Sequence, residues 1–288
     1  MAIAPVDAVS DDDEAIPVAA LYGGLEDGAA ATARFEADAS EGSGTVDLSR
    51  SLHRVSRPAR ASVWAGLRVA TLRRLVARAA GLDDRDVAGL CAALASAPAL
   101  EEIVVPRNGV GDGGCERLAR LVSRAPFALR VLDLGHNSIG AAGSRKLVTA
   151  LASREESRSA LERLGLAGSG ADDAVCGVIA ALVAAPDAAL RVLDLADTNV
   201  SDGGARVIAA AARSNPSSAL SRVSMSGARC GGAAAAAALG AFAAAAVTAR
   251  TRLEVRLAFG ASRARHAALA AVAPREGPRQ NLFRTPLV

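Results

Sequence analysis

A motif of about 29 residues recurs along this chain and limits the folds that it can adopt. Residues 128–153 show the motif most completely: alternating leucines, an asparagine, a glycine-containing turn, and then apolar residues at helical spacing. The alternation predicts a short strand, and apolar residues at i, i+3 and i+4 predict one apolar face of a helix. One strand and one helix cannot bury that face alone. The motif therefore predicts a fold in which copies stack side by side.

Six copies of the motif keep the same phase. The first leucine of each copy recurs at intervals of 28, 29, 32, 29 and 30 residues, at Leu72, Leu100, Leu129, Leu161, Leu190 and Leu220. Proline follows the predicted helix in four copies, where a residue without an N–H ends a helix. These prolines are Pro98, Pro126, Pro186 and Pro216.

The motif resembles that of the leucine-rich repeat family, in the long-repeat subtype typified by ribonuclease inhibitor. The family pattern L-x-x-L-x-L-x-x-N/C-x-L is met by Leu129, Leu132, Leu134, Asn137 and Ile139. The resemblance covers about residues 44–260. It implies an α/β fold, a leucine-rich-repeat solenoid (horseshoe) with parallel strands on the concave face and helices on the convex face.

The resemblance also gives the asparagine a role, because its side chain caps backbone groups of the loop in this family. Ser169, Thr198 and Ala228 replace the asparagine in later copies. We expect those turns to be less well held. Residues 154–159 lengthen the third copy by a polar insertion after its helix.

The repeats divide the chain into four expected parts. Residues 1–43 are expected to form an acidic, disordered leader, since residues 1–50 hold 11 Asp and Glu against 2 Arg. Residues 44–71 are expected to form a degenerate N-terminal capping repeat, and residues 72–273 the leucine-rich-repeat array with a C-terminal cap. Residues 274–288 are expected to form a flexible basic tail, since residues 251–288 hold 7 Arg against 2 Glu.

Composition narrows the class of partner and the compartment. The net charge is +3, so the total charge indicates neither nucleic acid nor a membrane as partner. We expect no secretory signal, because no positively charged start precedes an apolar core. The four cysteines show no C-x-x-C pairing and suit a reducing compartment. We expect a cytoplasmic, intracellular and monomeric protein without a transmembrane segment.

One pattern resembles a cofactor site. Residues 109–114 satisfy G-x-G-x-x-G between a predicted strand and a predicted helix, which is the context of a dinucleotide site. The same phase holds Gly140 with Gly143, and Gly203 with Gly204. We therefore interpret these glycines as a recurring turn and expect no cofactor.

Catalytic and metal-binding patterns are absent from the sequence. Asp133 and Asp194 occupy the same strand position two repeats apart, and carboxylates roughly 10 Å apart are able to form an acid–base pair. No neighbouring residue in the sequence would raise the pKa of one of the two carboxyl groups, so we interpret them as solvated. Histidines 53, 136 and 266 stand in separate units without metal spacing, and no Ser/His/Asp order, P-loop or H-E-x-x-H appears. We expect neither a metal site nor an enzyme.

The remaining candidate is the concave face, which the resemblance places at the non-leucine positions of the strands. This face is basic at both ends with acidic positions between. The chain holds 1 Trp, 1 Tyr and 5 Phe, so aromatic anchors are scarce and any binding is expected to be electrostatic. The predicted partner-binding residues are Arg74, Arg78, Glu102, Arg107, Asp133, His136, Arg163, Asp194, Asp197, Arg222 and Arg256.

The resemblance implies a non-enzymatic protein–protein interaction scaffold, because members of the family bind many unrelated protein partners. No nucleic acid, membrane or small-molecule substrate is expected. One alternative is an activator of a small GTPase, since activators of Ran resemble the same subtype. Their arrays are longer, and their acidic C-terminal tail is replaced here by a basic one. A second alternative is the sensing end of an immune-type receptor.

Overall fold

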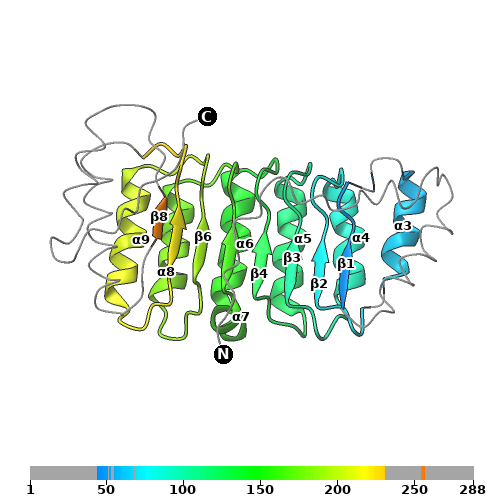
Figure 1. Ribbon diagram of the computed structural model, residues 1–288, viewed down its shortest axis with the longest axis horizontal. Coiled ribbons are helices and arrows are strands. Elements are labelled where there is room, and N and C mark those ends of the chain that lie inside the picture. Colours follow the sequence, from blue (N-terminus) through cyan, green and yellow to red (C-terminus); the bar gives the residue numbers. More distant parts are fainter. Residues whose placement is uncertain (1–43, 51, 53–54, 68, 231–253, 257–288) are drawn as a thin grey trace, which may run out of the picture.

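The computed structural model describes residues 44–50, 52, 55–67, 69–230 and 254–256. Eight strands form one parallel sheet in which spatial order follows chain order (Figure 1). The strands are β1 (Thr45–Asp47), β2 (Arg74–Val76), β3 (Glu102–Val104), β4 (Val131–Asp133), β5 (Arg163–Gly165), β6 (Val192–Asp194), β7 (Arg222–Ser224) and β8 (Glu254–Arg256).

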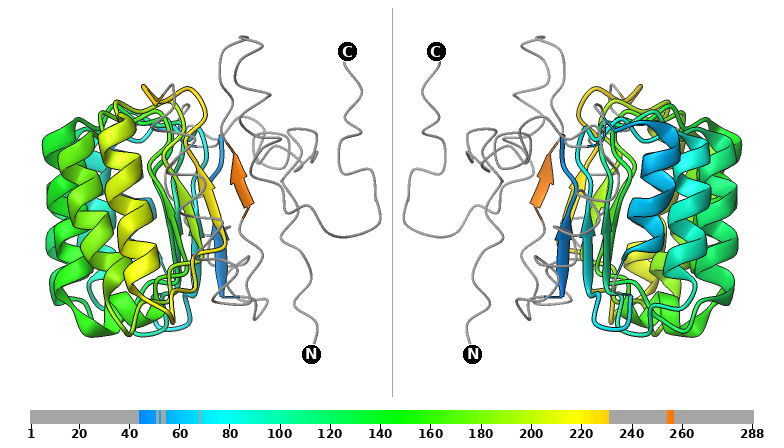
Figure 2. Two further views of the ribbon diagram at one scale, coloured as in Figure 1. Left: turned by 90° about the vertical axis from the view of Figure 1, so that its left-hand side faces the viewer. Right: turned by 90° about the vertical axis from the view of Figure 1, so that its right-hand side faces the viewer.

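The helices of the described ranges all lie on one side of this sheet, as the end-on views of Figure 2 show. They are α3 (Arg57–Ala65), α4 (Asp84–Leu94), α5 (Asp112–Arg124), α6 (Ala141–Ser153), α7 (Glu155–Ala160), α8 (Asp173–Ala184) and α9 (Asp202–Ser214). This arrangement confirms the predicted solenoid, with parallel strands on one face and helices on the other. We call the side of the sheet away from the helices the concave face.

The middle residue of each strand faces the helices. In-register pairing sets Leu132 beside Ile103 on one side and Leu164 on the other. These three side chains are 0% exposed and belong to one continuous core that runs from the first unit to Cys230. Alternation along a strand sends the first and third residues to the opposite side, which is why the predicted period of two sorts the core from the concave face.

Helix ends agree with the predicted proline stops. Helices α4, α5, α8 and α9 end at Leu94, Arg124, Ala184 and Ser214, and each ends before the proline of its unit. The polar insertion of the third unit forms the short helix α7. Arg154, which precedes α7, donates hydrogen bonds to the carbonyls of Val122 (2.6 Å) and Ala125 (3.0 Å). The insertion is thereby tied to the end of α5.

A buried arginine joins α3 to the next unit. The Arg60 guanidinium forms an ion pair with Asp86 at 2.6 Å, and both side chains are nearly buried. The same guanidinium donates to the carbonyls of Leu52 and Gly81. A buried charge requires such partners, so Arg60 serves the packing of α3 on α4 and is not available to bind a ligand.

Asparagine side chains hold the turns that follow β3 and β4. The Asn137 amide nitrogen donates to the carbonyls of Val105 (2.9 Å) and Leu134 (2.8 Å), and its oxygen accepts the N–H of Val110 at 3.2 Å. Asn108 makes the equivalent bonds one unit earlier. Each asparagine thus satisfies buried backbone groups of two successive units.

The turns without asparagine have fewer such bonds, as expected. The Ser169 hydroxyl accepts the N–H of Ala171, and the Thr198 hydroxyl donates to the carbonyl of Leu195. Both bonds stay within one unit. Neither side chain is long enough to reach the preceding unit.

Several predicted parts lie outside the described residues. These are the acidic leader (1–43), the basic tail (274–288) and, toward the end of the array and its cap, residues 231–253 and 257–273.

We predict that Leu132→Asp lowers the free energy of unfolding by about 4 kcal/mol or more, because it buries an unpaired carboxylate at the centre of the sheet. Urea denaturation followed by circular dichroism measures the loss. Val131→Asp is the matched control: it adds the same carboxylate one residue away, on the concave face, and should cost far less. Equal losses for the two variants would contradict the register.

Asn137→Ala is expected to cost about 3 kcal/mol, since it leaves buried backbone groups of two units without a partner. Thr198→Ala removes one bond within a single unit and should cost about 1 kcal/mol. Urea midpoints of the two variants give the comparison. A Thr198→Ala loss equal to that of Asn137→Ala would show that the bridging bonds add nothing.

Candidate functional site

The concave face consists of two rows, formed by the first and third residues of successive strands. Register pairs the first residues as Arg74, Glu102, Val131, Arg163, Val192 and Arg222. It pairs the third residues as Val76, Val104, Asp133, Gly165, Asp194 and Ser224. The structure therefore brings the predicted strand residues together on one surface. Arg256 continues the second row on β8, of which the backbone alone is described.

Charges at the starts of the strands pair with one another. Arg73 pairs with Glu101 at 3.0 Å, Glu101 with Arg130 at 3.3 Å, and Arg130 with Glu162 at 3.1 Å. Hydrogen bonds and charge from Glu162, with Glu101 on the other side, raise the pKa of Arg130 above its usual value. We call this network the charge ladder. It neutralises one edge of the concave face.

The charge ladder was not predicted from the sequence, although the sequence contains its signal. The residue after the first leucine alternates in sign through five successive units, at Arg73, Glu101, Arg130, Glu162 and Arg191. Comparing the same position between units, instead of reading each unit alone, would have revealed it.

Four predicted residues in the first half of the face already have partners. Arg74 pairs with Glu102 at 3.0 Å across β2 and β3. The Asp133 carboxylate accepts the N–H of Gly135 at 3.0 Å and lies 3.9 Å from an Arg163 guanidinium nitrogen. These groups stabilise the surface itself, and they are less available to a partner than the sequence suggested.

Asp133 and Asp194 lie two strands apart with Gly165 between them, as predicted from their phase. A Cβ atom on Gly165 would lie 2.6 Å from an Asp133 carboxylate oxygen, so Asp133 leans over this glycine. Asp194 accepts the N–H of Ala196 at 3.1 Å. Each carboxylate thus bonds to the backbone two residues ahead, which is a common local turn interaction.

Two valines of the second row are shielded from solvent. Val76 and Val104 are 6% and 4% exposed, although both stand in the second row of the concave face. They pair with each other in the register of β2 and β3. The first half of the face therefore presents little open apolar surface.

Residues at the other edge, where the strands end, adopt an unusual backbone conformation. Arg50, Ala79, Arg107, His136 and Asp197 have positive φ angles of 59°, 46°, 57°, 54° and 53°. Gly168 and Gly227 stand at the same phase in other units with φ of 65° and 71°. A side chain at such a position costs of order 1 kcal/mol, so four polar side chains are held where glycine would be unstrained.

Backbone hydrogen bonds keep this edge in register, because each runs to the residue before the same position of the next unit. In the second unit that position is Ala79, and Arg78 precedes it. The N–H of Arg50 donates to the carbonyl of Arg78 (2.9 Å), that of Arg107 to Gly135 (2.8 Å) and that of Asp197 to Ser226 (2.7 Å). We call Arg50, Arg78, Arg107, His136 and Asp197 the end row. It is basic along the first units and acidic at Asp197.

The end row differs from the charge ladder in its partners. No ion pair joins its side chains to other described residues, and Arg50, Arg107, His136 and Asp197 are exposed. Arg50 was not among the predicted residues. Its signal was its phase, which is that of Arg107. Arg222, on β7, is half-buried and takes part in a further interaction.

An aspartate of the preceding unit accepts a hydrogen bond from the glycine motif of residues 109–114. The Asp84 carboxylate accepts the N–H of Gly111 at 2.6 Å, at the start of α5. Asp112 likewise accepts the N–H groups of Gly140 (2.7 Å) and Gly143 (3.1 Å). A Cβ atom on Gly114 would lie 2.8 Å from Asp84, so glycine is needed for this approach. The Asp84 carboxylate occupies the N-terminus of α5, which is where the phosphate of a dinucleotide would have to bind.

Asp173 forms the same contact with the unit that follows. Burial alone would raise the pKa of the Asp173 carboxyl, but hydrogen bonds from the Ser201 side chain, the Ser201 backbone and the Gly204 backbone together lower it. The ionised form is therefore the one that the folded protein stabilises.

The thiols of the described residues are unreactive in character. All four cysteines are free, and Cys115 and Cys176 are buried. Burial raises the pKa of each of these two thiols to about 12. Within the described ranges, no cluster of His, Cys, Asp and Glu could hold a metal ion. None of the described helices is long and apolar enough to cross a membrane.

Asp173→Asn is expected to lower the free energy of unfolding at pH 7 by about 0.5–1 kcal/mol, a small effect because the group is solvent-exposed. The lowered pKa means that the carboxylate contributes above about pH 4 and loses its contribution as pH falls through the folded-state value. Thermal unfolding of both proteins at pH 7 and pH 3 tests this. A difference of equal size at both pH values would rule out the charge as its cause.

Comparison with known proteins agrees with the repeat architecture. Residues 128–148 and 189–209 match the family model described as "Leucine Rich repeat". They contain β4 and β6 and the first turns of α6 and α9. No match was found among curated proteins.

Solved structures are similar at low sequence identity. Leiomodin-1 actin-binding site 2 aligns with a TM-score of 0.36 and 11% identity over 47% of this chain and 76% of that one. An internalin (inlF) from Listeria monocytogenes aligns with a TM-score of 0.43 and 13% identity over 76% of this chain. The alignment spans 54% of the internalin. The matched repeats and the single parallel sheet make the described part of this chain a leucine-rich-repeat solenoid.

Proposed function

We propose that this chain is a non-enzymatic scaffold that binds a protein partner on its concave face. The observation that carries the proposal is the contrast between the two edges of that face. Charges of the charge ladder pair with one another, whereas Arg50, Arg107 and Asp197 of the end row are exposed and take part in no ion pair in the described part. Leucine-rich-repeat domains generally bind proteins, which agrees with this use of the surface.

The end row suggests the chemistry of the partner. Arg50, Arg78 and Arg107 make its first half basic, while Asp197, with Asp194 on the adjoining strand, makes its second half acidic. A partner with an acidic segment and a basic segment in the complementary order would fit. Such electrostatic contacts mainly raise the association rate and set orientation, so we expect modest affinity that falls with added salt.

The proposal also includes an intracellular location and the ribonuclease-inhibitor-like subtype. The free, buried cysteines favour an intracellular, reducing compartment. Units of 28–32 residues that each carry a helix favour the ribonuclease-inhibitor-like subtype among leucine-rich repeats.

Affinity capture from cell extract, read out by quantitative mass spectrometry, tests the concave face. Recovery of the partner should fall at least about tenfold with the end-row variant Arg78→Glu/Arg107→Glu, because like charges set against each other cost several kcal/mol. The variant Asp194→Lys/Asp197→Lys should do the same at the other half. Each variant is first checked for native circular dichroism.

Arg145→Glu is the matched control, since Arg145 is an exposed arginine of α6 on the opposite side of the solenoid. It should retain the partner. Recovery that is equal for the wild type, both end-row variants and the control would exclude the concave face as the binding surface.

A further inference from the structure

The outer surface of α4 carries small side chains. They are those of Gly89, Ala92 and Ala93 on the helix, with Ala95 and Ser96 directly after its end at Leu94. The residues 28 positions later, on or beside α5, are Arg117, Arg120, Leu121, Ser123 and Arg124. The small side chains of α4 leave a depression on each side of the helix, one toward α3 and one toward α5. We call the two depressions together the α4 trough.

The structure shows both depressions. The first lies between α3 and α4, has a volume of about 380 Å³, and is lined by Trp64, Leu67 and Val69 with the small residues of α4. The second lies between α4 and α5 and has a volume of about 260 Å³. Trp64 packs on Gly89, where an added Cβ atom would lie 2.6 Å from the indole ring. The α4 trough is therefore a built feature of the fold, with Arg60 fixing α3 as its outer wall.

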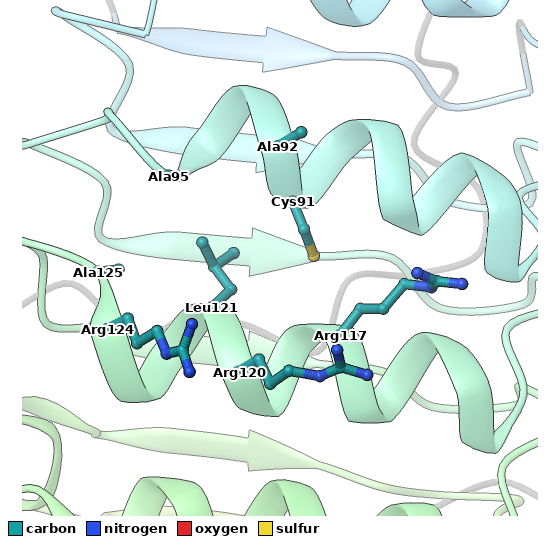
Figure 3. A pocket seen from close by; sticks show the side chains of 8 residues that line it. All are labelled: Cys91, Ala92, Ala95, Arg117, Arg120, Leu121, Arg124 and Ala125. Carbon is teal, nitrogen blue, oxygen red and sulfur yellow. The ribbon is translucent and has the colours of Figure 1, made fainter.

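The floor of the second depression is apolar and uncharged. Cys91 of α4 and Leu121 of α5 point toward one another across it (Figure 3). Burial raises the pKa of the Cys91 thiol to about 12, so the thiol stays neutral at physiological pH. The polar groups of the lining are the guanidinium groups of Arg117, Arg120 and Arg124, all from α5 (Figure 3).

Two of these arginines have no ion pair with a described residue. Arg120 pairs with Glu116 at 3.1 Å, and Glu116 also pairs with Lys146 at 3.0 Å. Arg117 and Arg124 are exposed and take no part in an ion pair within the described ranges. An apolar floor beside unpaired guanidinium groups suits an acidic segment that also carries apolar side chains.

We propose that the α4 trough binds residues 11–27 of the same chain. This segment contains six acidic residues and no basic one, so its charge complements the arginines of α5. Between its two acidic clusters it carries five larger apolar side chains that could enter the two depressions. These are Ile16, Val18, Leu21, Tyr22 and Leu25.

The connection to the described chain is long enough. Sixteen residues separate Asp27 from Gly44 and can span about 50 Å when extended. Helices α3, α4 and α5 follow β1, β2 and β3, so the α4 trough lies at the end of the solenoid where the described chain begins. Covalent linkage would give the segment a high effective concentration there.

The basic half of the end row is the competing surface for an acidic segment. Val76 and Val104, which lie beside it, are almost fully buried. The α4 trough joins its arginines to two depressions whose lining includes exposed or half-buried apolar side chains, those of Ala92, Ala95 and Val69, which is why we favour it. The proposal is independent of the concave-face scaffold function, since it concerns the opposite side of the solenoid.

Intrinsic fluorescence of the full chain tests the proposal. Tyr22 is the single tyrosine and Trp64 the single tryptophan, so energy transfer from tyrosine to tryptophan reports their proximity without a label. Transfer is measured as the tyrosine contribution to the excitation spectrum of tryptophan emission. The Tyr22→Phe variant, which lacks the donor, gives the baseline without transfer. Binding in the α4 trough predicts clear transfer that falls by at least half in Arg117→Glu/Arg124→Glu and at high salt.

Two variants sharpen the test. Arg145→Glu/Arg213→Glu reverses two other exposed arginines of the helical side, on α6 and α9, and should leave transfer unchanged. Changing Asp11, Asp12, Asp13 and Glu14 to Lys in the Arg117→Glu/Arg124→Glu chain should restore transfer by exchanging the charges.

Three results would overturn the proposal. Transfer that is absent, or equal in the wild type and Arg117→Glu/Arg124→Glu, would exclude the α4 trough. Transfer lost instead in Arg78→Glu/Arg107→Glu would place the segment on the concave face. Transfer that rises with protein concentration would show that a second copy supplies the segment.

Discussion

The solenoid depends on one buried aliphatic side chain at the centre of each strand. Leu132 is fully buried because Ile103 and Leu164 flank it in register and a helix covers it. No unit could bury this side chain alone, so each unit is stabilised by its neighbours. The requirement falls on one face of the sheet. It leaves the concave face and the outer helix surfaces free to vary, and both candidate binding surfaces lie there.

Two polar networks supplement this core by joining each unit to the next. One runs through asparagines such as Asn137, and the other through aspartates such as Asp112 at the helix starts. Both are interrupted at the same place. Ala141 stands where the next aspartate would be, and Ser169 where the next asparagine would be. There the backbone bond from Gly170 to Ile139 at 2.7 Å continues the connection. The junction between α6 and α8 therefore relies more on its apolar packing than its neighbours do.

Hydrophobic period and prolines were sufficient to predict the strands, the helix stops and the core, because these depend on residues within one unit. Interactions between units were harder to predict. The charge ladder requires comparison of one position across five units, and the burial of Val76 and Val104 does not follow from their place in the second row. The α4 trough arises from the small size of Ala92 beside Arg120 on the adjacent helix. The trough becomes recognisable only when the two helices are placed side by side.

The alternating signs of the charge ladder give the array a second period, of two units. Removing one unit would bring two arginines or two glutamates into contact, whereas removing two neighbouring units would preserve alternation. Residues 128–134 and 189–195, which lie two units apart, are identical in sequence. Like charges side by side repel, so an array of this kind gains or loses repeats most easily in pairs. The length of the array then changes by two repeats at a time, although the structural unit is a single repeat.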